Sequence, residues 1–176
     1  LNENYEKSRT VLKNFGKDQD FYHWYKTKKE AQIISITRNQ KEGLNYIASK
    51  FEKIKNPNNK FIFDIANFYK NSKEYDQAIK YYSIIINSLS ENTEIKSDLL
   101  YRRGGSYERL KDYFNADKDL LHSLEINPND AYVLNYLAYS WLERDYKIDK
   151  AIEMLEIAYA SESDDPYIID SIGWAY

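Results

Sequence analysis

The sequence predicts an all-α protein built from repeated pairs of helices, that is, an α-solenoid. Glycine and proline are scarce, with five and three among 176 residues, and few turn residues favour helices over a many-stranded sheet. Small residues recur at intervals of 35, 35, 38 and 35 positions, at Ser8, Gly43, Ala78, Ala116 and Ala151. A regular interval of this size is typical of helical repeat proteins.

A second series of small residues lies twelve or thirteen positions before members of the first, so each repeat holds two helices. Its members are Ala31, Ala66, Gly104, Ala138 and Gly173. A larger residue follows each of them three positions later, at Ile34, Tyr69, Tyr107, Trp141 and Tyr176. Two helices need small side chains where their axes cross, and a bulky side chain fills the space beside the crossing.

The ends of the helices fit the same register, because all three prolines fall at expected junctions between repeats. Residues 56–59 have the composition of a turn around Pro57. Asp130 is placed to cap a helix that opens at the next residue. Asp165 is placed in the same way, with Pro166 in the first helical turn, where its missing N–H has no cost.

These residues resemble the tetratricopeptide repeat family, whose repeat is a helix–turn–helix of 34 residues. The resemblance covers essentially the whole chain and implies a right-handed α-solenoid of such hairpins. It divides the chain into the second helix of a preceding repeat (1–17), a degenerate repeat (24–58), a repeat with an extended second helix or loop (59–96), two further repeats (97–130 and 131–165), and the first helix of a truncated repeat (166–176).

Both ends of the chain fall inside a repeat, and the chain begins with Leu1 rather than Met. We therefore expect a fragment of a longer array whose true N-terminus is missing. The abundance of Lys, Asn, Ile and Tyr resembles coding from an AT-rich, bacterial genome. The compartment, cytoplasmic or periplasmic, stays open, and we expect a soluble chain because no apolar run approaches the length of a membrane span.

The sequence offers no motif for catalysis, so we expect a chain that is not an enzyme and binds no cofactor or metal. It has no cysteine and only two histidines, His23 and His122, which fall in different repeats. No P-loop, GxGxxG or GxSxG motif is present. The pair Gly104-Gly105 lies inside a predicted helix and indicates close helix packing. Asp164 and Asp165 are interpreted as helix-start residues.

The resemblance implies a concave groove lined by the first helix of each hairpin, in which a peptide or a helix of another protein would bind. Tyrosine and tryptophan bury large areas at low entropy cost, and asparagine and arginine can bind a peptide backbone. The groove residues expected are Tyr25, Lys28, Phe63, Asn67, Tyr101, Arg102, Tyr132, Asn135, Tyr136, Tyr139 and Trp174.

Some members of the family clamp a terminal carboxylate with lysine, asparagine and arginine. The corresponding positions here are Lys28, Gln32, Asp64, Asp98 and Arg102. Only Lys28 and Arg102 agree with the clamp, and the two aspartates would repel a carboxylate. The sequence therefore predicts a groove that lacks this clamp.

The net charge of −3 argues against a nucleic-acid partner, including the single-stranded RNA that pentatricopeptide arrays read. The charge is uneven, at +5 over 1–58, −1 over 59–128 and −7 over 129–176. The leading hypothesis is a scaffold for another protein or peptide of unknown identity. Self-association as a homo-oligomer through an uncapped end remains open, as does service as the recognition arm of a larger protein whose catalytic domain lies outside this sequence.

Overall fold

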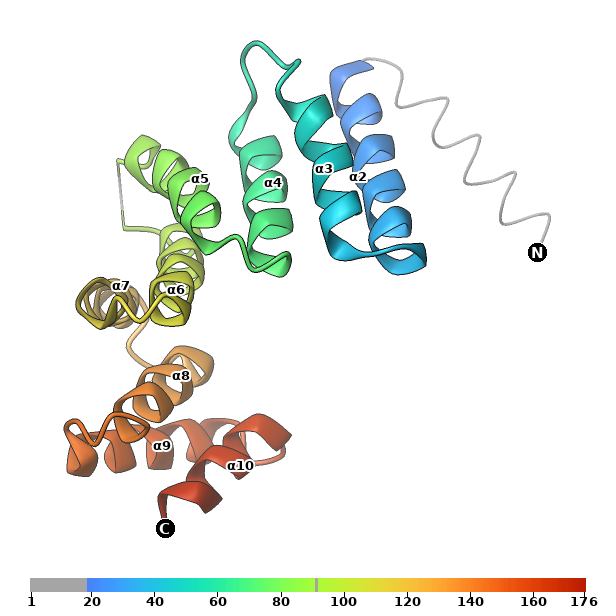
Figure 1. Ribbon diagram of the computed structural model, residues 1–176. Helices are drawn as coiled ribbons and strands as arrows, with labels where there is room; N and C mark the ends of the chain where they lie inside the picture. Colours follow the sequence, from blue (N-terminus) through green and yellow to red (C-terminus); the bar gives the residue numbers. More distant parts are fainter. Residues whose placement is uncertain (1–18, 91) are drawn as a thin grey trace, which may run out of the picture. The chain divides into compact units, whose positions relative to one another are not determined.

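The computed structural model describes residues 19–90 and 92–176, and over these residues it contains nine α-helices and no strand. The helices are α2 (Gln19–Thr37), α3 (Gln40–Phe51), α4 (Asn59–Asn71), α5 (Tyr75–Ser88), α6 (Glu94–Arg109), α7 (Tyr113–Ile126), α8 (Ala131–Leu142), α9 (Ile148–Ser161) and α10 (Pro166–Ala175) (Figure 1). The prediction of an all-α helical repeat is confirmed. The helix expected in 1–17, with Ser8, lies outside the described residues.

The described residues divide into two compact units, one that ends at residue 74 and one that begins at residue 75. In the first unit, α2 packs along α3, and α3 packs against α4 (Figure 1). In the second unit, each helix from α5 to α9 packs on the helix that follows it, and α10 packs on both α8 and α9. Contacts are therefore made mainly between helices that are neighbours in the sequence, as in repeat proteins.

Helix caps form at the junctions between repeats, and those of Asp130 and Asp165 are the ones that the sequence predicts. The side chain of Asn58 accepts a hydrogen bond from a backbone N–H in the first turn of α4. Asp130 and Asp165 each accept two such bonds, at the starts of α8 and α10, and Pro166 occupies the first turn of α10. Each of these bonds satisfies a donor that the helix itself leaves unpaired, which fixes where the helix begins.

The link after α5 and the start of α6 are both longer than their counterparts around α8. Helix α5 has 14 residues, as do α7 and α9. Helix α6 begins at Glu94, where Thr93 caps it, and it has 16 residues. The additional length is therefore divided between the link from α5 to α6 and the first turn of α6.

The small residues lie at helix crossings, as predicted, with one exception. Ala31, Ala66, Ala78 and Ala138 are fully buried. A Cβ atom on Gly104 would lie 2.9 Å from Cγ of Leu120, which confirms close packing there. Gly173 differs, because it is exposed and a Cβ atom on it would have no neighbour within 4 Å. No described helix crosses α10 at that point.

Alanine in place of Gly43 is expected to lower the free energy of unfolding by about 1–3 kcal/mol, the cost of overpacking a core. Helix propensity alone predicts a gain of roughly 1 kcal/mol. The added Cβ atom would, however, lie 2.7 Å from the carbonyl oxygen of Ala31 and would collide with the Ser35 hydroxyl. Urea unfolding followed by circular dichroism would measure the change.

Gly173→Ala is the matched control for Gly43→Ala, because both glycines are helical and only Gly43 is enclosed. We expect this control to leave stability unchanged or to raise it by up to about 1 kcal/mol. A Gly43→Ala protein as stable as the control would show that α2 and α3 can separate without cost.

The core of the second unit centres on α8, with α9, α10 and the end of α7 around it. Trp141, Leu137 and Leu155 are fully buried in a continuous apolar cluster. The Trp141 ring packs edge-on against Tyr146 at 5.7 Å between centroids. Trp141, the bulky residue predicted three positions after the small residue Ala138, therefore fills the space beside the helix crossing.

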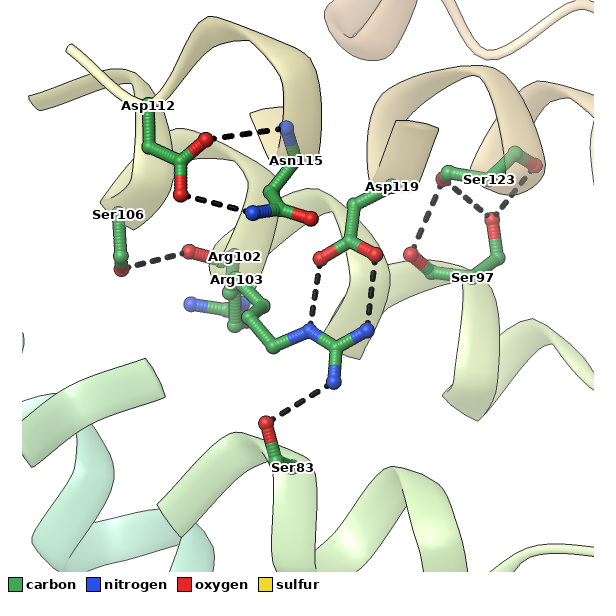
Figure 2. A network of polar contacts seen from close by, with 9 residues as sticks. All are labelled: Ser83, Ser97, Arg102, Arg103, Ser106, Asp112, Asn115, Asp119 and Ser123. Carbon is green, nitrogen blue, oxygen red and sulfur yellow. Dashed lines mark hydrogen bonds and ion pairs between the residues drawn. The ribbon is translucent and has the colours of Figure 1, made fainter. Parts of the chain in front are cut away.

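A buried ion pair joins α6 to α7 and extends to α5, as Figure 2 shows. The guanidinium of Arg103 donates from Nε and Nη2 to the two carboxylate oxygens of Asp119, at 2.7 and 2.8 Å, and from Nη1 to the Ser83 hydroxyl at 2.9 Å. Burial acts to lower the pKa of Arg103, but the hydrogen bonds and charge of Asp119 outweigh burial and hold that pKa above its ordinary value. The arginine therefore stays charged.

Candidate functional site

The expected groove residues all lie on alternate helices, α2, α4, α6, α8 and α10. Four of them belong to the first unit and lie on α2 and α4, namely Tyr25, Lys28, Phe63 and Asn67. Seven belong to the second unit and lie on α6, α8 and α10, namely Tyr101, Arg102, Tyr132, Asn135, Tyr136, Tyr139 and Trp174. Each unit thus presents its own set of candidate side chains.

In the first unit, an aromatic cavity of about 340 Å³ lies between α2 and α4. Its lining residues are Phe21, Tyr22, Trp24, Tyr25, Lys28, Lys60 and Asp64. The ring of Trp24 is 3% exposed and stacks on Phe61 at 5.1 Å. The ammonium group of Lys60 lies 4.2 Å from the ring centre of Phe21. The wall is therefore held in place by packing, and its chemistry suits an apolar side chain.

A second cavity, of about 360 Å³, lies in the same unit and shares Lys28 and Asp64 with the first. Its other lining residues are Gln32, Ser35, Ile36, Gln40, Asn67, Phe68 and Asn71. Four of these residues carry a side-chain amide, which offers both a donor and an acceptor. The Ser35 hydroxyl has no hydrogen-bond partner among the described residues. Such a lining suits a peptide backbone, which also presents donors and acceptors.

The wall shared by the two cavities is an ion pair between α2 and α4. Nζ of Lys28 lies 2.9 Å from Oδ1 of Asp64, and the indole Nε1 of Trp24 donates to Oδ2 at 2.9 Å. The two charged side chains are only 22% and 11% exposed. Sequence reasoning placed Lys28 in the groove but missed Trp24, although the aromatic run of residues 21–25 was a usable signal.

In the second unit, Tyr101 and Tyr136 serve packing between α6 and α8. Their rings meet edge to face at 5.8 Å, and both pack against the apolar core. The Tyr136 hydroxyl donates to Glu108 at 3.0 Å. Burial raises the pKa of both hydroxyl groups, most strongly at Tyr136. Truncating these two residues would therefore disturb the fold as well as any bound partner.

Three other aromatic residues of the second unit are exposed, and we call them the aromatic face. They are Tyr132 and Tyr139 on α8 and Trp174 on α10, with 51%, 37% and 56% of their surfaces exposed. The rings of Tyr139 and Trp174 lie 5.5 Å apart. Asn135 lies in the same row of α8, and its side-chain oxygen is buried without a hydrogen-bond partner among the described residues. The aromatic face is the part of this set that a partner could reach.

The two cations that agree with the carboxylate clamp are both paired within their own units. Lys28 binds Asp64, as described above, and Nε of Arg102 donates to Asp98 at 2.8 Å. The aspartates that replace the clamp residues thus neutralise the remaining cations. This pairing supports the prediction of a groove that lacks the clamp.

Among the described residues, no group of three or more His, Cys, Asp or Glu side chains is arranged to hold a metal ion. Within the same residues, no helix has the length and apolar character needed to cross a membrane.

The sequence matches the tetratricopeptide repeat family model over residues 60–83 and 97–130. A TPR repeat-containing protein of Pseudomonas aeruginosa is 30% identical over 119 residues, which cover 58% of this chain and 20% of that relative. The chain therefore spans about a fifth of the length of the curated relative that it matches.

Solved structures share the fold at low sequence identity. BtubC from P. vanneervenii superposes with a TM-score of 0.73 at 13% identity, over 97% of this chain and 80% of that one. The APC/C hetero-tetramer Cut9–Hcn1 gives a TM-score of 0.68 at 17% identity, over 86% of this chain and 29% of that one. The first TPR domain of Spaghetti, solved with the HSP90 peptide SRMEEVD, gives 0.58 at 17% identity, over 66% and 89%.

Proposed function

Because the chain belongs to the tetratricopeptide repeat family, we propose that it is a protein-interaction scaffold that binds a peptide segment along α2 and α4. The observation that carries this proposal is the pair of adjoining cavities on either side of Lys28 and Asp64. One cavity is aromatic and the other is lined by amides. An extended peptide could place an apolar side chain in the first and hydrogen-bond its backbone in the second.

The chemistry of the walls favours binding over catalysis. The polar groups that line the second cavity are mainly amides and a hydroxyl, which form hydrogen bonds but do not transfer protons readily near neutral pH. The one carboxylate, Asp64, is held by Lys28 and by Trp24. Peptide binding by the Spaghetti domain supports the proposal by analogy of fold. The acidic peptide of that complex is not the expected ligand, because the clamp residues differ.

The proposal predicts that Tyr25→Ala combined with Gln32→Ala weakens the binding of peptides selected on the wild-type chain. A phage-displayed library of random peptides would supply the ligands, and fluorescence polarisation would give their affinities. Each cavity then loses one exposed lining side chain. We expect affinity to fall by about tenfold or more, which is about 1.4 kcal/mol.

Ile33→Ala is the matched control, because Ile33 lies on α2, is 59% exposed and lines neither cavity. Its peptide affinities are expected to equal those of the wild type. If the library yields no binder, or if the double variant binds as tightly as the control, peptide binding along α2 and α4 is refuted.

A further inference from the structure

The aromatic face of the second unit lies between carboxylates at both of its ends. Tyr132 stands near Asp165 and Glu162, whose negative charges raise the pKa of its hydroxyl group. At the other end, Tyr139 hydrogen-bonds Glu143, which raises the pKa of Tyr139, and the charge of Asp170 adds to the effect. Carboxylates therefore act on both tyrosines of the aromatic face.

The second unit as a whole is acidic. Residues 75–176 contain 10 basic and 19 acidic side chains, a net charge of −9, whereas residues 1–74 contain 15 and 9, a net charge of +6. Helix α8 carries no charged residue, and α10 carries only Asp170. Neither of the helices that form the aromatic face therefore provides a cation of its own.

Three basic side chains around the aromatic face, Arg109, Arg144 and Lys147, already have partners. Arg144 binds Asp117 at 2.8 Å, and Lys147 lies over the ring of the buried Trp141 at 4.6 Å. Arg109, whose charge reaches Tyr139, lies 3.6 Å from Glu108. Each of these cations has a partner other than Glu143 and Asp170, which are both exposed carboxylates.

We infer that the aromatic face binds a cationic peptide segment, one that carries arginine or lysine. This inference rests on the proposed scaffold function and names the chemical class of a partner for the second unit. A guanidinium or ammonium group is attracted to the face of a tyrosine or tryptophan ring. Nearby carboxylates accept its hydrogen bonds and strengthen the attraction. The exposed rings of Tyr132, Tyr139 and Trp174 and their acidic surroundings provide both contacts together.

The test uses the whole chain and three short fluorescein-labelled peptides in fluorescence polarisation. The probe alternates alanine with arginine, and the matched peptides carry glutamine or glutamate in place of arginine. We expect the arginine peptide to bind at least about tenfold more tightly than the glutamine peptide, and the glutamate peptide not to bind. The affinity of the arginine peptide is expected to fall as salt is added, because exposed charges are screened.

Three double variants test where the arginine peptide binds and how far the binding depends on charge. Tyr132→Ala with Trp174→Ala is expected to weaken the arginine peptide by about tenfold or more. Phe114→Ala with Tyr159→Ala, which removes exposed aromatic rings of α7 and α9, is the matched control and is expected to bind as the wild type does. Glu143→Gln with Asp170→Asn keeps the rings and is expected to reduce the dependence on salt.

Equal affinities for the arginine and glutamine peptides would overturn the inference, as would loss of binding only in the Tyr25→Ala, Gln32→Ala protein. The scaffold proposal would survive that result if library peptides still bound along α2 and α4. Sedimentation velocity without peptide tests the other possible occupant of the aromatic face, which is a second copy of the chain. Self-association that disappears in Tyr132→Ala, Trp174→Ala, without arginine-peptide binding, would assign the face to a second copy of the chain and overturn the inference.

Discussion

Replacing Asp119 by alanine is expected to lower the free energy of unfolding by about 3–5 kcal/mol, the range observed when one partner of a buried ion pair is removed. The Asp119 side chain is 6% exposed and that of Arg103 is 16% exposed. Without the carboxylate, the guanidinium loses two short hydrogen bonds and keeps only Ser83. Urea unfolding followed by circular dichroism would measure the loss.

The neighbouring pair of Arg102 and Asp98 provides a matched control for the effect of burial. The distance is similar, at 2.8 Å, but the Asp98 side chain is 46% exposed. Asp98→Ala is expected to cost less than about 1 kcal/mol. Arg103→Met combined with Asp119→Leu is expected to restore most of the lost stability, because no charge is then left buried. If Asp119→Ala costs no more than Asp98→Ala, the buried pair does not hold α6 and α7 together.

Trp141→Ala is expected to cost about 3–5 kcal/mol, the range for deleting a buried aromatic side chain. Trp141 is 0% exposed and lies at the centre of the second unit's core. Its removal would leave a cavity on α8 and would take away the ring partner of Tyr146 and Lys147. Thermal and urea unfolding, both followed by circular dichroism, would report the change.

Trp174→Ala is the control for Trp141→Ala, since it deletes the same side chain from a site that is 56% exposed. A loss below about 1 kcal/mol is expected there. Trp141→Phe is expected to cost much less than Trp141→Ala, because it keeps most of the ring and removes an indole N–H that has no hydrogen-bond partner in the described part of the chain. Equal losses for the two alanine variants would contradict the central place of Trp141 in the core.

The sequence by itself determined the class of the fold and the starts of three helices, α4, α8 and α10. The interval of about 35 residues between small side chains reflects helices crossing again and again at close range, and Ala31, Ala66 and Ala138 are buried as it predicted. Asp130 and Asp165 could be recognised as caps because a cap acts on N–H groups only two or three residues away. The division of the chain into the repeats named above remains a prediction.

Other local features of the chain have no sequence signal. Lys73, Lys111, Asp145 and Lys147 adopt left-handed backbone angles between helices, where glycine would ordinarily mark the position. The enclosure of Gly43 by Ser35 could not be predicted either, because it depends on how closely α2 and α3 approach each other.

For the candidate site, the sequence named side chains, and only the tertiary structure decided their roles. Tyr101, Tyr136 and Tyr139 looked alike in the sequence, yet the first two pack against the core while Tyr139 belongs to the aromatic face. Lys28 and Asp64 are 36 residues apart and neutralise each other. The physical reason is that burial and charge pairing depend on which helices face each other. A local sequence pattern does not contain that information.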